Sequence, residues 1–178
     1  MPAKCCLILI MGVAGSGKTT LAKAILRHLS AVYLDNNHIV DSFFPDTRSG
    51  RRYEKLRPNF YQALYTIAEE NLKVGNSVLL DVPHVKEIQD ARWRRFIERL
   101  AARTESKIIV IRCFCSERAL YSRIRSRNEK RDRLKLEQWK KFLTTQRIDV
   151  AIPFPHLDID TENNLPENVS AAIRYIQK

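Results

Sequence analysis

The stretch ILIMGVAGSGKTT, residues 8–20, decides the fold of this 178-residue chain. An apolar run leads into a segment with three glycines, and a lysine and two threonines follow. Residues 12–19 fit the pattern G-x-x-x-x-G-K-[ST], whose glycines let backbone N–H groups surround phosphate oxygens without obstruction from a Cβ atom. The apolar run predicts a buried strand, and the amphipathic stretch after it predicts a helix whose N-terminus points at the same anion. The sequence therefore predicts a phosphate-binding loop and nucleotide binding.

The chemistry of this loop assigns roles to individual residues. Lys18 is expected to reach the β and γ phosphates as a point charge, and the Thr19 hydroxyl is expected to hold Mg²⁺. Asp81 ends the apolar run SVLLD, where a carboxylate can steady the same ion through water; the alternative is an ordinary strand-end aspartate that caps the next loop. The residues expected to bind the nucleotide in this loop are Gly12, Ala14, Gly15, Ser16, Gly17, Lys18, Thr19 and Thr20.

Asp35 ends the run AVYLD, which follows the first predicted helix. In a doubly wound sheet this strand end faces the nucleotide crevice, so the carboxylate can accept a proton from an attacking hydroxyl as a general base. The alternative is the N-cap of a helix that starts near Asn37, and Asn36, Asn37 and Asp41 compete for either role. The pattern favours the base and leaves the cap open.

Apolar runs of strand length alternate with stretches of helical period along the whole chain. The strand-like runs are Cys5–Met11, Ala31–Leu34, Ser77–Leu80, Lys107–Phe114 and His156–Ile159. The helical stretches are Lys18–Leu29, Asn59–Val74, Glu87–Arg103, Ser116–Arg127 and Glu167–Ile176. This alternation predicts a single α/β domain, residues 1–178, with a parallel sheet covered by helices on both faces. Two polar, basic segments, 42–58 and 128–138, interrupt it and are expected to be loop-like and movable.

The formal net charge of +11 indicates an acidic partner, such as a nucleotide, a phosphorylated metabolite or nucleic acid. The segment 42–58 follows the Asp35 strand, where an acceptor would enter, and is expected to bind a negatively charged acceptor; a solvated loop is the alternative. Arg123, Arg127 and Arg131 are spaced by four and would share one face of a continuous helix. Arginines near the γ phosphate stabilise the charge that develops during transfer, so 123–138 is expected to form a lid, with a solvated helix face as the alternative.

The apolar runs and the cysteines indicate a cytoplasmic protein. No apolar run approaches the ~18 residues of a membrane span, so no membrane partner is expected. The first run is too short for the core of a signal peptide, and no small-residue cleavage site follows it. The four cysteines lack CxxC spacing and a histidine at ligand spacing, which favours core thiols in a reducing compartment.

Taken together, these motifs resemble the small P-loop kinases related to polynucleotide kinases and gluconate kinase. The resemblance is carried by GVAGSGKTT at 12–20, YLD at 33–35, VLLD at 78–81, RSRNEKRDRL at 125–134 and HLDID at 156–160. The fourth of these is similar to the R-N-x-x-R lid signature of that group, although Asp132 stands where the lid usually continues with glycine.

The resemblance implies a three-layer fold with five parallel strands in the order 2-3-1-4-5. It also implies phosphoryl transfer from ATP with Mg²⁺, with Asp35 as the base that activates the acceptor and Arg127 and Arg131 as lid arginines that grip the donor phosphates. The expected function is a kinase acting on a hydroxyl of a small or anionic acceptor. Two alternatives stay open: a polynucleotide 5′-hydroxyl kinase, and a nucleotide-dependent switch or ATPase without a small acceptor. The acceptor itself and the choice between ATP and GTP are not encoded in any short motif.

Overall fold

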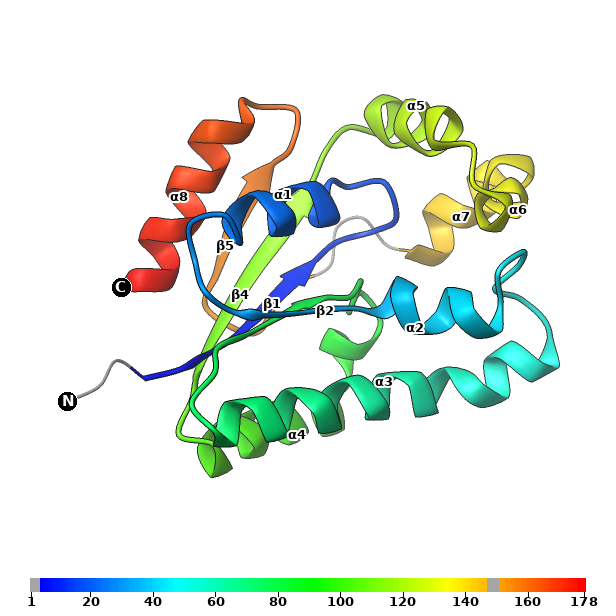
Figure 1. Cartoon of the computed structure of the whole chain (residues 1–178). Coiled ribbons are helices and arrows are strands. Elements are labelled where there is room, and N and C mark those ends of the chain that lie inside the picture. Colours follow the sequence, from blue (N-terminus) through cyan, green and yellow to red (C-terminus); the bar gives the residue numbers. More distant parts are fainter. Residues whose placement is uncertain (1–3, 147–150) are drawn as a thin grey trace.

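The computed structural model describes residues 4–146 and 151–178, which form a three-layer α/β fold (Figure 1). All strand pairings are parallel, and the order β2-β3-β1-β4-β5 is the one that the kinase resemblance implies. The strands are β1 (Cys6–Met11), β2 (Val32–Asp35), β3 (Val78–Asp81), β4 (Lys107–Phe114) and β5 (His156–Asp160). Each lies within one residue of its predicted bounds at either end.

Helices cover both faces of the sheet because the central strand β1 is apolar on both sides. Leu7 and Leu9 pack toward α3 (Arg51–Lys73) and α4 (Ala91–Arg103). Ile8 and Ile10 pack toward α1 (Lys18–Ile25) and α8 (Leu165–Gln177) on the opposite face. All four side chains are fully buried, so the strand that leads into the phosphate-binding loop is anchored in both halves of the core.

The predicted helices are present, with changed ends. The first stops at Ile25 instead of Leu29, and the predicted stretch from Glu87 becomes a 3₁₀ turn, η1 (Glu87–Gln89), before α4 begins at Ala91. The longest helix, α3, ends as expected with Gly75 in the left-handed region, at φ 87°. Ser116 caps α5 (Glu117–Arg127), as expected, by accepting a hydrogen bond from the amide of Ala119.

The two segments expected to be loop-like are largely helical, which corrects that prediction. The first includes the end of α2 (Asn36–Phe43) and the first turns of α3, which continues through Pro58. Phe44 contacts both Tyr53 and Phe60 on α3, at ring-centroid distances of 5.4 and 6.0 Å, so aromatic packing holds the start of α3 against the end of α2.

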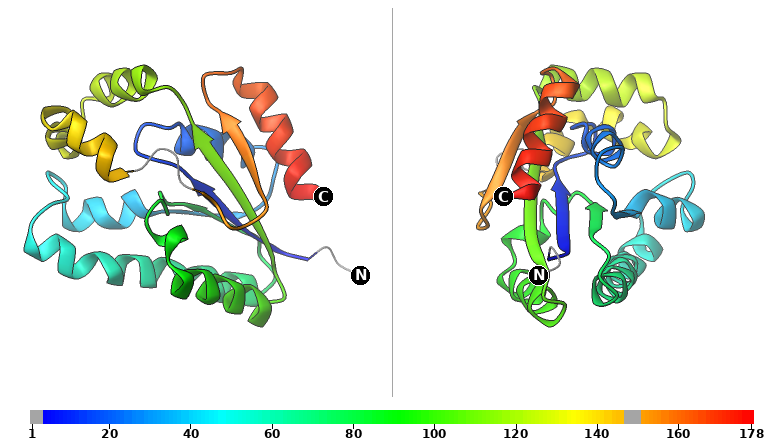
Figure 2. Two further views of the ribbon diagram at one scale, coloured as in Figure 1. Left: turned by 180° about the vertical axis from the view of Figure 1, so that it is seen from behind. Right: turned by 60° about the vertical axis from the view of Figure 1, so that its left-hand side comes forward.

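The second segment, which follows α5, contains the 3₁₀ turn η2 (Lys130–Asp132) and the short helix α6 (Arg133–Glu137), and α7 (Trp139–Gln146) follows. The helices α5, α6 and α7 lie together at one end of the molecule, and the C-terminal end of α8 lies at the other (Figure 2). Within the described residues, no helix is both long enough and apolar enough to cross a membrane.

Candidate active site

The phosphate-binding loop leaves β1 at Gly12 and enters α1 at Lys18, as the pattern predicts. Gly12, Gly15 and Gly17 all have positive φ, at 139°, 85° and 84°. A Cβ atom on Gly12 would lie 2.3 Å from the carbonyl oxygen of Cys113, so the loop requires glycine there for space as well as conformation. Ser16 is fully buried and its hydroxyl has no hydrogen-bond partner among the described residues.

Lys18 lies inside this loop and is 8% exposed. Its ammonium group donates a hydrogen bond of 3.0 Å to the carbonyl oxygen of Val13, which holds the side chain along the loop. Burial lowers the pKa of Lys18, and the carboxylates of Asp81 and Asp35 act against that shift. An anion in the loop would favour the charged ammonium, so the residue suits a phosphate site.

A hydroxyl and a carboxylate meet where β3 ends beside α1. The Thr19 hydroxyl donates a hydrogen bond of 2.5 Å to Asp81 Oδ2, and the Tyr33 hydroxyl donates to the same oxygen at 3.0 Å. Asp81 is 2% exposed, and burial raises its pKa while Lys18 opposes the rise. The structure therefore brings together the two residues predicted to hold Mg²⁺.

Asp35 is the immediate neighbour of Asp81 in the parallel register of β2 and β3. Its Oδ1 accepts a hydrogen bond of 2.8 Å from the amide of Asn37, so the carboxylate caps α2. Its Oδ2 accepts a longer bond of 3.3 Å from Tyr33. Asp35 thus does cap α2, which was the alternative role. Its Oδ2 keeps lone pairs that face no other donor among the described residues.

A cavity of about 660 Å³ joins this loop to the segment after β2 and to the lid. Its wall includes Asn36 and Asn37, although not Asp35 itself. Among the described residues, eight cationic side chains line it: Lys18, Arg48, Arg57, Lys86, Arg123, Arg127, Arg131 and Lys135. Three acidic side chains of the same part of the chain do so: Glu54, Asp81 and Glu87. This excess of positive charge suits a polyanionic ligand.

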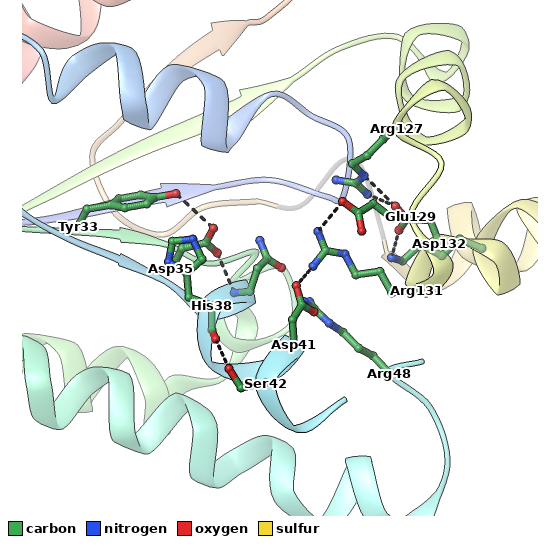
Figure 3. A network of polar contacts seen from close by, with 12 residues as sticks. Tyr33, Asp35, His38, Asp41, Ser42, Arg48, Arg127, Glu129, Arg131 and Asp132 are labelled. Carbon is green, nitrogen blue, oxygen red and sulfur yellow. Dashed lines mark hydrogen bonds and ion pairs between the residues drawn. The ribbon is translucent and has the colours of Figure 1, made fainter. Parts of the chain in front are cut away.

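Both predicted lid arginines line the cavity, and each is paired with a carboxylate (Figure 3). Arg127 donates to Asp132 Oδ2, and Asp132, which is fully buried, also binds Lys135 through its other oxygen. Arg131 binds Asp41. The usual glycine position of the lid is therefore occupied by a carboxylate that holds one of the two arginines.

The expectation that three arginines share one helix face is wrong. The helix α5 ends at Arg127 because Asn128 adopts the left-handed conformation, with φ 52°, and Arg131 follows in the turn η2. Arg123 also lines the cavity, but its partner is not a carboxylate: it donates to the Thr161 hydroxyl at 2.7 Å and to the Thr161 carbonyl oxygen at 2.9 Å. It connects the lid helix to the turn after β5.

The geometry fits a nucleoside triphosphate with Mg²⁺. The glycine cradle, the buried ammonium of Lys18 and the start of α1 offer donors to phosphate oxygens. The described residues contain no group of three or more His, Cys, Asp and Glu side chains placed to hold a metal ion. The pair formed by Thr19 and Asp81 is the arrangement expected for Mg²⁺, which usually takes one or two protein oxygens together with substrate phosphates and water.

Sequence reasoning missed Tyr33 as a member of this site, and it considered Asp41 only as a base or a cap and missed its ion pairs. Tyr33 contacts both Asp35 and Asp81, and its position two residues before Asp35 on the same strand face was a usable signal. Asp41 binds Arg48 and Arg131 with its two oxygens. No local pattern reveals the second pairing, because these residues lie 90 positions apart.

A protein-family model described as an AAA domain matches residues 7–147. No match was found among curated proteins. Solved structures do match: a proposed kinase from Chloroflexus aurantiacus is 21% identical with a TM-score of 0.74, and the alignment covers 99% of this chain and 98% of that one. At this identity the likeness concerns the fold alone.

Two further kinases share the fold. A sugar kinase from Janibacter sp. is 16% identical with a TM-score of 0.71, covering 97% of this chain and 95% of that one. The APS kinase CysC of Mycobacterium tuberculosis, solved with AMPPNP and APS, is 17% identical with a TM-score of 0.65, covering 99% of this chain and all of that one. The fold is thus a kinase-like P-loop fold shared with small-molecule kinases.

Proposed function

We propose that this chain, which belongs to the AAA domain family of P-loop proteins, is an ATP- and Mg²⁺-dependent kinase that phosphorylates a hydroxyl of a small or anionic acceptor. One observation carries the proposal: a single cavity is lined by the phosphate-binding loop, by the segment after β2 and by the lid. A donor nucleotide and a small acceptor can meet there, which places the acceptor hydroxyl beside the γ phosphate for transfer.

In this proposal the loop amides and Lys18 bind the β and γ phosphates. Thr19 and Asp81 hold Mg²⁺, and the ion, when bound, neutralises charge on the phosphate oxygens. Thr19 and Asp81 already lie 2.5 Å apart, oxygen to oxygen, so little rearrangement is needed to bring them to one ion. The Tyr33 hydroxyl keeps Asp81 oriented from the other side.

Asp35 is proposed as the general base. Its Oδ2, bonded only to Tyr33 at 3.3 Å among the described residues, takes the proton of the acceptor hydroxyl as that oxygen bonds to the γ phosphorus. The bond from the γ phosphorus to the bridging oxygen of ADP breaks in the same reaction. Because Oδ1 caps α2, the helix fixes the position of the carboxylate.

Arg127 and Arg131 are proposed to exchange their carboxylate partners for the transferring phosphoryl group. Both line the cavity, and an arginine that is already oriented by a carboxylate loses less side-chain freedom when a phosphate replaces that partner. Their guanidinium groups would stabilise the charge that develops on the equatorial oxygens.

The test is ATP consumption with Mg²⁺ against a panel of acceptors: sugars, sugar acids, nucleosides, nucleoside monophosphates and 5′-hydroxyl oligonucleotides. The diagnostic variant is Asp35→Asn, because asparagine caps a helix as well as aspartate but cannot accept the proton. We expect acceptor-dependent release of ADP by the native chain and a fall in kcat of at least about 100-fold in the variant, within the usual range for a lost general base.

A second variant, Asp35→Ala, controls for the cap, and ATP binding by calorimetry controls for the fold. Unchanged nucleotide affinity in Asp35→Asn would place its defect in the chemical step. Turnover that ignores every acceptor and is equal in Asp35→Asn would refute the kinase and favour a switch or ATPase. A strong preference for oligonucleotides, with affinity that falls steeply with salt, would instead identify a polynucleotide kinase.

A further inference from the structure

One side chain in the cavity wall has an unexplained polar atom. Asn36 is only 5% exposed, and its carboxamide oxygen Oδ1 is buried without a hydrogen-bond partner among the described residues. The same residue lines the cavity at the start of α2. Buried amide oxygens nearly always have a partner, so an unpartnered one in the wall of a binding cavity indicates a ligand that supplies the missing donor.

The local backbone does not account for an asparagine at this position. Asparagine near a helix start usually caps the helix, but here Asp35 already does so by accepting the hydrogen bond from the amide of Asn37. Asn36 comes one residue later, as the first residue of α2. An apolar residue of the same size would therefore fill the site without loss of a cap, and the amide is left for another use.

We infer that Asn36 is a specificity residue for the phosphate acceptor, and that its carboxamide turns toward the cavity so that Oδ1 accepts a hydrogen bond from a second hydroxyl or an amino group of that acceptor. The inference rests on the proposed function. Its ligand is the acceptor because Asn36 directly follows the proposed base, Asp35, and borders the same cavity as Arg48 and Tyr53.

The chemistry of the wall limits the class of acceptor. A carboxamide oxygen close in sequence to Asp35, whose own register partner is Asp81, attracts a neutral or cationic donor and repels an anion. An anionic group of the acceptor would lie instead toward Arg48, whose Nε is also buried and has no hydrogen-bond partner within residues 4–146 and 151–178. The acceptor therefore has at least two donor groups: the reacting hydroxyl and one that binds Asn36.

The test compares Asn36→Leu, which is nearly isosteric, with Asn71→Leu as a matched control. The amide of Asn71 is bonded to the carbonyl oxygen of Ile67 on α3, and the residue does not line the cavity. With the best acceptor of the panel, we expect Asn36→Leu to raise the acceptor KM about tenfold, the effect of one lost hydrogen bond. In Asn36→Leu, the concentrations of ATP and of Mg²⁺ that give half of the maximal rate should stay unchanged. In Asn71→Leu, all KM values should stay unchanged.

Thermal unfolding without ligands supplies the second measurement. Removing an unpartnered buried oxygen should leave the Tm of Asn36→Leu unchanged or raise it, whereas a structural amide would lower it. An unchanged acceptor KM, or an increase confined to Mg²⁺ or ATP, overturns the inference. If the native chain phosphorylates no compound of the panel, the proposed function fails separately, and the Tm alone tests Asn36. A lower Tm for Asn36→Leu then overturns the role of Asn36 as a free binding group, and an equal or higher Tm supports that role.

Discussion

His84 provides the sharpest prediction for the stability of the fold. It is fully buried, follows the cavity-lining residue Pro83 in the sequence, and lies in a chain of hydrogen bonds. Trp93 donates to the Tyr65 hydroxyl at 2.7 Å, which in turn is 2.6 Å from His84 Nε2. His84 Nδ1 lies 3.0 Å from the carbonyl oxygen of Val82, which can only accept. Every hydrogen bond in this series has a donor and an acceptor when the imidazole is neutral, with its proton on Nδ1 and with Nε2 as acceptor.

Burial lowers the pKa of His84 from the ordinary value of 6.5 to about 4, although nearby Glu87 opposes the shift. Between these values the unfolded chain binds a proton that the folded chain does not, so the free energy of unfolding rises with pH through this window. The interval of about 2.5 pH units, at about 1.4 kcal/mol each, corresponds to about 3 kcal/mol. That stability is present above pH 6.5 and is lost as the pH falls toward 4.

The assay is urea unfolding of the native chain and His84→Asn at several pH values from 4 to 8. Asparagine is chosen because position 84 has φ 53°, a left-handed conformation that asparagine tolerates. The variant should be less stable at pH 8, but its free energy of unfolding should lose about 3 kcal/mol less than that of the native chain on acidification to pH 4.

Other carboxylates titrate in the same range, so only the difference between the native chain and the variant tests the reasoning. Parallel curves for the native chain and His84→Asn from pH 6.5 to 4 would show that His84 becomes protonated within the fold. The account of a neutral, desolvated imidazole would then be wrong.

Two further variants test the loop and the lid. Gly12→Ala places a Cβ atom 2.3 Å from the backbone oxygen of Cys113. We therefore expect the free energy of unfolding to fall by about 1–3 kcal/mol and ATP binding to be lost. A native Tm and a native ATP affinity would contradict this interpretation of the loop. Asp132→Asn removes a fully buried charge shared by Arg127 and Lys135, and should lower the free energy of unfolding by about 2 kcal/mol at pH 7; an unchanged urea midpoint would show that the two pairs contribute nothing net.

The sheet and the phosphate-binding loop could be predicted because their signals are local. The apolar strand, the three glycines and the lysine lie within a dozen residues, and hydrophobic periodicity identifies the strands that follow. Asp81 could be placed near Thr19 because parallel strands end at one edge of the sheet. The structure confirms that contact, while the Mg²⁺ that it suggests stays a prediction.

The lid could not be predicted in the same way. A regular spacing of four indicates one helix face only while the helix continues, and α5 stops where Asn128 takes a left-handed conformation. Charge clusters also do not reveal their partners: Arg131 contacts Asp41 on α2, and Lys130 contacts Asp46, at 2.9 Å, in the segment after it. These pairings depend on how α2 and the lid are arranged in space, which no local pattern encodes.

These pairings also bear on the role of the positive charge at the cavity. Of the eight cations that line the cavity in the described part of the chain, five are paired with carboxylates: Arg48, Arg57, Arg127, Arg131 and Lys135. Carboxylates therefore hold and partly neutralise these five cations at the cavity. A triphosphate, with several charges on one ligand, can replace carboxylates that each supply one. We therefore expect the cations of this cavity to serve a small, highly charged donor, with acidic residues that keep its arginines in place before the donor arrives.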